Sequence, residues 1–157
     1  MNYSRKLFSY TMHHDTVPEK IFPLLCPVRE YEWIEHWKCE MIYSESGYAE
    51  LDCIFKTNFP DDGEDIWVVS KYNPPSVIEF VRINKLRSIR YLITLSEYQP
   101  GKTQSEWRQV ITALNENGNI LVSDLSEQEF ISEKMVLEKL LNHYLLTKKM
   151  FKLQDSD

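Results

Sequence analysis

Apolar and polar residues alternate along most of the chain with a period of two. Near the start, Phe8, Tyr10 and Met12 alternate with polar neighbours, which predicts a β-strand over about residues 4–14. The same alternation, rich in β-branched and aromatic residues, predicts six further strands. They lie over about residues 38–43, 52–57, 66–72, 76–84, 87–98 and 103–115. Short breaks with turn-forming residues separate most of them, so antiparallel hairpins are expected. Asn117-Gly118, after the last strand, is interpreted as a further turn.

Two regions follow a helical spacing instead. Thr16 is expected to cap a short helix with Pro18 in its first turn, and Pro27 limits that helix. The second region covers about residues 126–149, where apolar residues recur every three or four positions. They are Phe130, Val136, Leu137, Leu140, Leu141, Tyr144 and Leu145. This pattern predicts one long amphipathic helix near the C-terminus.

The predicted order is strand, short helix or helices, six strands and a long helix. No repeat, low-complexity block or linker divides residues 1–157, so a single domain is expected. An antiparallel sheet with one long helix is an α+β fold and cannot be doubly wound. The sheet is expected to curl around the helix, so that each buries its apolar face against the other.

Composition narrows the classes of function. The net charge of −6 argues against a nucleic-acid surface, and no apolar run is long enough for membrane insertion. The first residues do not resemble a signal peptide, and three cysteines do not indicate a disulfide framework. We therefore expect a cytoplasmic protein. Aromatic residues make up 13% of the chain, a content that suits a large core or a ligand cavity.

Several stretches resemble the START-like superfamily, also called SRPBCC, which contains birch-pollen-allergen-like, polyketide cyclase/dehydrase and lipid-transfer proteins. The resemblance covers essentially the whole chain. It is carried by the first strand, by TVPEKIFPLL at residues 16–25, by the Trp33/Trp37 pair and by LNENGN at residues 114–119. LLCPVREYEWI followed by CEMIYSESGYAE is similar to a bacterial subgroup. The resemblance implies a helix-grip fold: a seven-stranded curved antiparallel sheet around the C-terminal helix, with short helices between strands 1 and 2.

In such proteins the sheet and the long helix enclose a cavity, which leads to the first hypothesis for function. A small hydrophobic or aromatic ligand is expected to bind there, held by apolar burial and oriented by a few polar groups. The candidate lining residues are Tyr10, Met12, Phe22, Trp33, Trp37, Met41, Phe55, Trp67, Phe80, Tyr91, Trp107, Leu137, Leu141 and Tyr144. The alternative for this set is a filled core without a cavity.

The second hypothesis is an enzyme resembling the polyketide cyclases and dehydrases, working in the same cavity without a metal. There a Tyr, His or Arg would polarise a carbonyl while a base removes a proton. The candidate catalytic residues are His14, Tyr72, Arg82, Tyr91 and Tyr144. A third hypothesis is an interaction protein resembling chaperone co-regulators, which would use the outer face of the sheet. The sequence also permits a homodimer.

The stretch CPVREYEWIEHWKCE, residues 26–40, raises the question of a metal site. Cys26, His36 and Cys39 are potential ligands, but their spacing does not match that of structural zinc sites. We expect buried or half-buried free thiols, no metal and no cofactor. Glu30, Glu32 and Glu35 are interpreted as a solvated outer face. The stretch is predicted to form a helical wall, bearing the two tryptophans, near the mouth of the cavity.

Three polar positions inside strand patterns bear on the cavity. His14 continues the face of Tyr10 and Met12 and is therefore the better cavity candidate of the His13-His14 pair. Arg82 is in step with apolar neighbours, but an arginine usually faces solvent, so an outward direction is favoured. Strand 103–115 offers two alternative inner faces, Trp107/Gln109/Ile111 and Arg108/Val110/Thr112.

Overall fold

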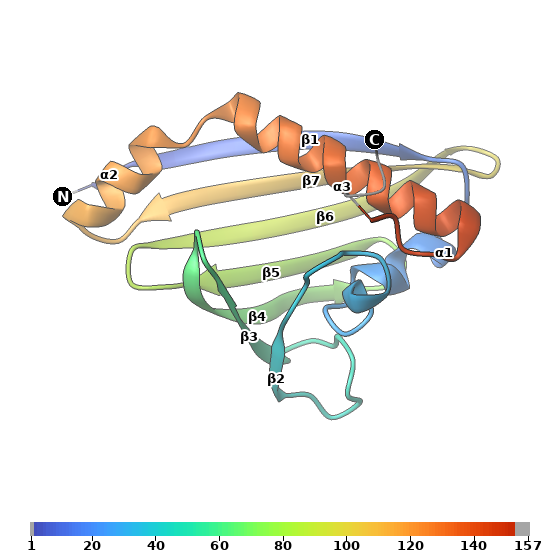
Figure 1. The fold of residues 1–157 in the computed structure, drawn as a ribbon, viewed down its shortest axis with the longest axis horizontal. Coiled ribbons are helices and arrows are strands. Elements are labelled where there is room, and N and C mark those ends of the chain that lie inside the picture. The colour runs from blue at the N-terminus through green and yellow to red at the C-terminus, as the bar shows by residue number, and fades with distance from the viewer. Residues whose placement is uncertain (1, 153–157) are drawn as a thin grey trace.

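The computed structural model describes residues 2–152 and contains one antiparallel sheet of seven strands, shown in Figure 1. The spatial order is β1-β7-β6-β5-β4-β3-β2, so β1 and β2 form the two edges. The strands are β1 (Arg5–His14), β2 (Glu40–Tyr43), β3 (Ile54–Phe59), β4 (Gly63–Asn73), β5 (Val77–Ile83), β6 (Arg87–Gln99) and β7 (Lys102–Ala113). Every strand predicted from the alternation is present.

The helices lie at the ends and on one side of the sheet. Three short helices connect β1 to β2: α1 (Pro18–Ile21), η1 (Phe22–Leu25) and η2 (Glu30–Glu32). After β7 come α2 (Glu116–Asp124) and the long helix α3 (Glu127–Thr147). Figure 1 shows α3 running along β1 and β7, with α2 and α1 at opposite ends of the sheet. This is the predicted helix-grip fold.

Two local predictions around the helices are wrong. Thr16 does not cap α1: Val17 occupies that position without a side-chain hydrogen bond, and the helix is held by its proline start and its buried Ile21. Residues 117–118 were interpreted as a turn, but they lie in α2, where the Asn115 side chain accepts a hydrogen bond from the Gly118 amide at 2.8 Å. A side chain at Gly118 would bring its Cβ to 2.0 Å from the Leu86 carbonyl oxygen. Glycine here permits a close approach of two backbones.

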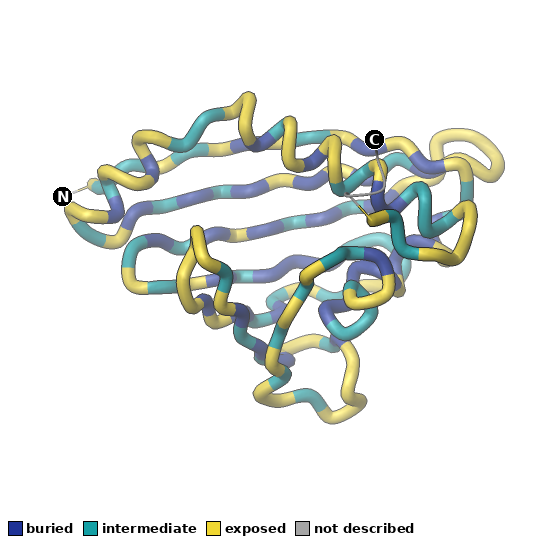
Figure 2. The backbone as a smooth tube through the Cα atoms, viewed as in Figure 1, coloured by how far each residue is buried: buried dark blue, intermediate teal, exposed yellow. Residues whose placement is uncertain are grey.

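The inner face of the sheet is the face covered by α3 and the short helices. Alternate residues of each long strand are buried, as Figure 2 shows for β6 and β7. In β7 the inner face is Trp107, Gln109 and Ile111, which resolves the alternative left open by the sequence. Arg108 faces outward and is exposed. Arg82 faces inward and is buried, so the expectation of an outward Arg82 is wrong.

Candidate functional site

A cavity of about 190 Å³ lies between the inner face of the sheet, α3 and the segment around η2. Its wall is apolar on most sides and aromatic on several. The lining residues are Glu30, Trp33, Ile34, Trp37, Phe55, Phe59, Trp67, Phe80, Arg82, Tyr91, Ile93, Trp107, Lys134 and Leu137. The core is therefore not completely filled, and we treat this cavity as the candidate site.

Aromatic rings fix the shape of the cavity. Phe55 stacks on Trp67 with ring centroids 5.1 Å apart, and Phe80 meets both rings edge-on. Register explains this cluster, because Phe55 and Trp67 are direct partners across β3 and β4. All four tryptophans of the chain line the cavity. Tryptophan fluorescence therefore reports on the cavity wall.

Two tryptophans also tie the short helices to the cavity. The Trp33 indole is buried and donates a hydrogen bond to the Leu24 carbonyl oxygen at 2.8 Å. The Trp37 indole donates to the Pro27 carbonyl oxygen, also at 2.8 Å. Only Glu30–Glu32 is helical in this stretch, so the predicted helical wall is a single 3₁₀ turn followed by irregular chain. Its two tryptophans nevertheless lie on the cavity wall.

Lys134 of α3 brings an amino group to this cavity. Its side chain is 6% exposed, and its Nζ donates a hydrogen bond to the Tyr91 hydroxyl oxygen. Nζ also lies over the rings of Tyr91 at 4.6 Å, Phe130 at 5.3 Å and Trp107 at 5.7 Å. No salt bridge joins Lys134 to a carboxylate of residues 2–152. Burial lowers the pKa of Lys134 to about 8.

Glu30 contributes a carboxyl group to the same cavity. Glu30 is half-buried when its backbone and side chain are taken together, and its side chain lines the cavity. Burial of the carboxyl group raises its pKa well above the usual range. The charge of Lys134 opposes this rise without cancelling it. The interpretation of Glu30 as part of a solvated outer face is therefore wrong. Glu32 is exposed as expected, and Glu35 is half-buried.

Arg82 reaches the cavity from β5 and is held by a buried ion cluster. Its guanidinium lies 4.2 Å from the centroid of the Trp67 ring and donates a 2.5 Å hydrogen bond to Asp65. Arg87 makes two further hydrogen bonds to Asp65, at 2.5 and 3.0 Å. Burial would raise the pKa of Asp65, but Arg87 and Arg82 outweigh that effect and hold it below its usual value. The Nε of Arg82 is buried and has no hydrogen-bond partner within residues 2–152.

Three of these polar side chains also border a second hollow. Arg82, Tyr91 and Lys134 line both the cavity and a neighbouring hollow of about 210 Å³ toward α2 and the start of α3. They therefore stand between the two spaces. The second hollow is more polar, since Asp62, Gln109, Glu129 and Glu133 are also on its wall. The cavity thus has an aromatic body and one polar boundary.

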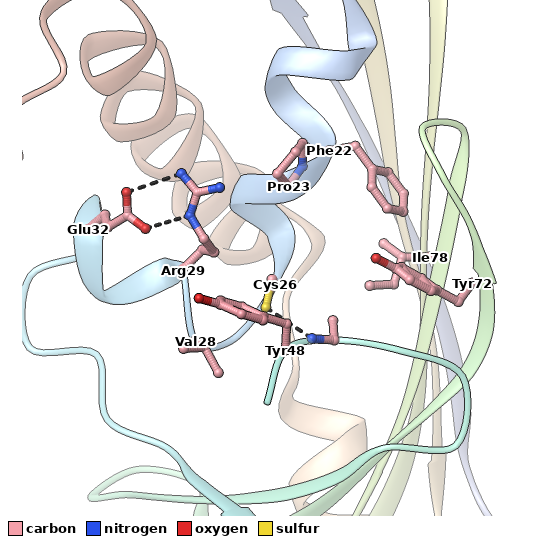
Figure 3. A pocket seen from close by; sticks show the side chains of 10 residues that line it. Phe22, Pro23, Cys26, Val28, Arg29, Glu32, Tyr48, Tyr72 and Ile78 are labelled. Carbon is pink, nitrogen blue, oxygen red and sulfur yellow. Dashed lines mark hydrogen bonds and ion pairs between the residues drawn. The ribbon is translucent and has the colours of Figure 1, made fainter. Parts of the chain in front are cut away.

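A different pocket, of about 510 Å³, lies beside the short helices, as Figure 3 shows. It is larger than the cavity and more open to solvent. Its charged groups are already paired: Arg29 donates to Glu32 at 2.5 Å, and the Tyr144 hydroxyl donates to Glu32 at 2.6 Å. The Sγ of Cys26 accepts a hydrogen bond from the Ala49 amide at 3.2 Å. The hydroxyl groups of Tyr48 and Tyr72 on its wall have no hydrogen bond within the described residues, but both residues are at least partly exposed to solvent. We favour the smaller cavity because its polar groups, on Arg82 and Lys134, are buried.

The predicted lining residues divide into two groups. On the cavity wall lie Trp33, Trp37, Phe55, Trp67, Phe80, Tyr91, Trp107 and Leu137. Away from it lie Tyr10, Met12, Phe22, Met41, Leu141 and Tyr144. Met12 and Leu141 are fully buried in the core beside α3, and Phe22 lines the pocket of Figure 3. The Tyr10 hydroxyl donates to Glu138 at 2.5 Å on α3, and Met41 lies half-buried on the edge strand β2.

Of the candidate catalytic residues, only Arg82 and Tyr91 reach the cavity. His14 is buried as its strand parity predicts, but both ring nitrogens are bonded, to Asn142 and Ser105, each at 2.7 Å. Burial lowers the pKa of His14, so it is a neutral group linking β1, β7 and α3. Tyr72 lines the pocket of Figure 3, and Tyr144 bonds Glu32. These three are not brought together with Arg82 and Tyr91.

The three candidate metal ligands do not form a cluster. Cys26 bonds the Ala49 amide, Cys39 lies 3.8 Å from the Pro27 carbonyl oxygen, and His36 is exposed beside Glu35. Within residues 2–152, no group of three or more His, Cys, Asp or Glu side chains is arranged to hold a metal ion. The helices of that part of the chain are also too short or too polar to cross a membrane.

Sequence reasoning missed two polar site residues, Lys134 and Glu30, and three apolar ones, Ile34, Phe59 and Ile93. Lys134 lies four residues after Phe130 and three before Leu137, so it occupies the apolar stripe of α3. A lysine inside such a stripe is the signal that could have found it. Glu30 carried no comparable signal, because the irregular chain around η2 has no period from which to infer its direction.

Comparison with solved structures identifies the same fold in proteins of low sequence identity. Ara h 8.0201 is 12% identical, with a TM-score of 0.66, and the match covers 92% of this chain and 99% of that one. Norcoclaurine synthase from Thalictrum flavum, solved with dopamine and hydroxybenzaldehyde, is 10% identical, with a TM-score of 0.68 and coverage of 94% and 90%. The Aha1 dimer from Colwellia psychrerythraea is 13% identical, with a TM-score of 0.60 and coverage of 87% and 96%.

Models of protein families and curated protein sequences give no match to this chain. The structural likeness, at these identities, concerns the fold. It confirms the helix-grip architecture that the sequence predicts, which is the fold of the START-like superfamily.

Proposed function

We propose that the protein binds a small aromatic or apolar molecule in the cavity between the sheet and α3. The observation that carries the proposal is an unfilled space of about 190 Å³ with aromatic walls and one polar boundary. An apolar cavity of about 150 Å³ is large enough for benzene. A single ring with a short substituent therefore fits the available volume, and its burial would supply the affinity.

The polar boundary gives the ligand an orientation. Lys134 has donors beyond the one used on Tyr91, and the Nε of Arg82 is a buried donor without a partner in the described chain. A ligand oxygen at this boundary would satisfy them, while the ring packs against the tryptophans. The dopamine and hydroxybenzaldehyde in the norcoclaurine synthase complex are single-ring aromatic molecules held by a protein of the same fold, which supports a ligand of this size.

Tryptophan fluorescence tests this proposal directly, because all four tryptophans line the cavity. Titration with benzyl alcohol is expected to change the emission saturably. Leu137→Phe should fill part of the cavity and weaken binding by about tenfold or more, a difference of roughly 1.4 kcal/mol. Leu146→Phe is the matched control, because Leu146 lies on the same helix and is 85% exposed. Equal titrations for the wild type and both variants would contradict the proposal.

A second candidate is an enzyme resembling the cyclases, working in the same cavity. The observation that favours it is the opposite displacement of two pKa values: that of Glu30 is raised, and that of Lys134 is lowered. Groups separated in this way suit the roles of acid and base. Conversion of a bound carbonyl compound, lost in both Glu30→Gln and Lys134→Met, would support this function over binding alone.

The interaction hypothesis has less support, because the interior is not closed. Ile66 and Ile83 are exposed beside each other on β4 and β5, but no partner is indicated. We also infer a cytoplasmic location, which the three unpaired cysteines Cys26, Cys39 and Cys53 support. A homodimer stays a prediction, to be measured by light scattering.

A further inference from the structure

We propose that the cavity captures a small aromatic aldehyde or ketone as a reversible imine on Lys134. This inference rests on the proposed binding function and names the chemical class of the ligand. Three structural features carry it: a primary amine on the cavity wall, hydrogen-bonding acids beside it, and aromatic walls of matching size.

The amine is the first feature. Most lysines reach water or a carboxylate, whereas Lys134 is buried, touches aromatic rings and has no ion pair with residues 2–152. A lysine in these surroundings holds a neutral amine more readily than a surface lysine does, and a neutral amine is the nucleophile for imine formation. Burial is the main cause of the lowered pKa of Lys134, and the charge of Arg82 acts in the same direction. Glu133 and Glu30 oppose the lowering without cancelling it.

The acids are the second feature. The Tyr91 hydroxyl is bonded to Nζ, and burial raises its pKa, so it keeps its proton. Glu30 faces the same cavity with a raised pKa and therefore retains a proton above the usual range of a carboxylic acid. Either group can donate a proton to the oxygen of a bound carbonyl compound and later recover it.

The reaction balances without an oxidant or a reductant. The Nζ lone pair attacks the carbonyl carbon, a C–N bond forms, and the carbonyl electron pair moves to oxygen, which takes up a proton. Nitrogen gives up one of its two N–H protons, so a neutral carbinolamine results. Tyr91 or Glu30 then protonates the hydroxyl group of the carbinolamine, which leaves as one molecule of water while the nitrogen lone pair forms the C=N bond. Loss of the remaining N–H proton leaves the neutral C=N bond. Hydrolysis reverses each step, so the imine is in equilibrium with the free carbonyl compound.

Reductive trapping tests the inference with benzaldehyde as the probe. Cyanoborohydride reduces an imine to a stable secondary amine, so each trapped chain gains one benzyl group. Intact mass followed by peptide mapping is expected to place this group on Lys134 at pH 8, at least tenfold faster than on any other lysine. Lys134→Met should lose the fast phase. Lys139→Met is the matched control, because Lys139 is exposed on the same helix, and it should keep the fast phase.

A competition experiment in the wild type removes any dependence on how the variants fold. Benzyl alcohol has the same ring but no carbonyl group, so it should occupy the cavity and slow the labelling of Lys134 at least fivefold. Labelling of Lys134 that benzyl alcohol does not slow would overturn the inference, because the aldehyde would then not react from the cavity.

Tryptophan fluorescence separates failure of the imine from failure of the binding function. If benzaldehyde and benzyl alcohol both bind but reduction labels only surface lysines, the imine inference is wrong and the binding function stands. If neither molecule changes the fluorescence and Lys134 is not labelled, both proposals are wrong.

Discussion

Two groups of buried ionisable side chains meet at the cavity, the first only through Arg82, and they differ in how their charges are compensated. Asp65 of β4 is fully buried and is bonded by both Arg82 and Arg87 at 2.5 Å. Lys134 and Glu30 are not joined by a salt bridge, and each is displaced toward its neutral form. The first group is a framework that holds Arg82 in place. The second leaves reactive groups facing a ligand-sized space.

The difference has a physical cause in the elements that carry each group. Asp65, Arg82 and Arg87 project from β4, β5 and β6, which the hydrogen bonds of the sheet hold at fixed spacing. Such spacing allows bidentate pairing, which offsets the cost of burying charge. Lys134 and Glu30 come from α3 and from the 3₁₀ turn η2, two elements that no shared hydrogen-bond ladder holds at a fixed spacing. Their charges therefore stay less well compensated.

The largest expected effect comes from breaking the framework. Asp65→Asn would leave two buried arginines without their carboxylate, and the free energy of unfolding should fall by about 3–5 kcal/mol. Asp62→Asn is the matched control, because Asp62 meets Arg82 at 3.3 Å but is 46% exposed, and it should cost less than about 1 kcal/mol. Urea denaturation at pH 7 measures both. If the free energy of unfolding fell by a similar amount in both variants, the claim that Asp65 belongs to a buried framework and Asp62 does not would be contradicted.

A low pH should reduce the difference in unfolding free energy between the wild type and Asp65→Asn. The folded-state pKa of Asp65 lies below its unfolded value, so its contribution to stability is fully present above about pH 4. That contribution is lost as the pH falls through the folded-state value. A difference in unfolding free energy that stays constant down to pH 2 would contradict this assignment.

The charge of Lys134 should have the opposite effect on stability, because at pH 7 it destabilises the folded protein whereas the charge of Asp65 stabilises it. Its pKa falls from 10.5 to about 8 on folding, so the unfolded state binds more protons between these values, and stability rises with pH across that window. Lys134→Met removes the buried charge and should raise the free energy of unfolding at pH 7 by as much as about 3 kcal/mol. The gain should shrink from pH 8 and vanish near pH 10.5.

Lys139→Met serves as the control in those measurements, since its side chain is exposed. Denaturation series at several pH values compare the two variants with the wild type. A loss of stability in Lys134→Met, independent of pH, would show that Lys134 is charged and well compensated in the folded protein.

The smallest effect is expected from the hydroxyl group that contacts Lys134. Tyr91→Phe removes the acceptor of the Lys134 hydrogen bond, and this favours the neutral amine. The pKa of Lys134 should fall by about one unit or less, equivalent to roughly 1.4 kcal/mol or less. Carbon-13 NMR of labelled lysine measures it. A rise of the pKa would contradict the assigned direction of the hydrogen bond.

The sequence predicts the frame of this molecule better than its site. Period-two alternation indicated every strand, and the three-and-four spacing after Ser126 indicated α3. These patterns are informative because the residues on the buried face of a strand or helix recur at a regular spacing along the chain. They fail at α2, where Gly118 indicates a turn but lies in a helix. A glycine is needed there because the backbone of Leu86, more than thirty positions earlier, leaves no room for a side chain.

The site depends on contacts that no local pattern encodes. Arg82 and Arg108 look alike in the sequence, yet only Arg82 has a buried partner, Asp65, on the neighbouring strand. Lys134 was overlooked because a charged residue in an amphipathic helix is expected to face water. The burial of Lys134 depends on the space beside the rings of Tyr91 and Trp107. That space exists only once the strands that carry these rings have packed against α3.

Carbon-13 NMR titration of the Lys134 side chain, with and without benzyl alcohol, tests the central claim most directly. We predict a pKa near 8 for Lys134, together with a saturable shift of its signal when benzyl alcohol enters the cavity. A pKa near 10.5 with no response to benzyl alcohol would contradict both the buried amine and the ligand-binding cavity.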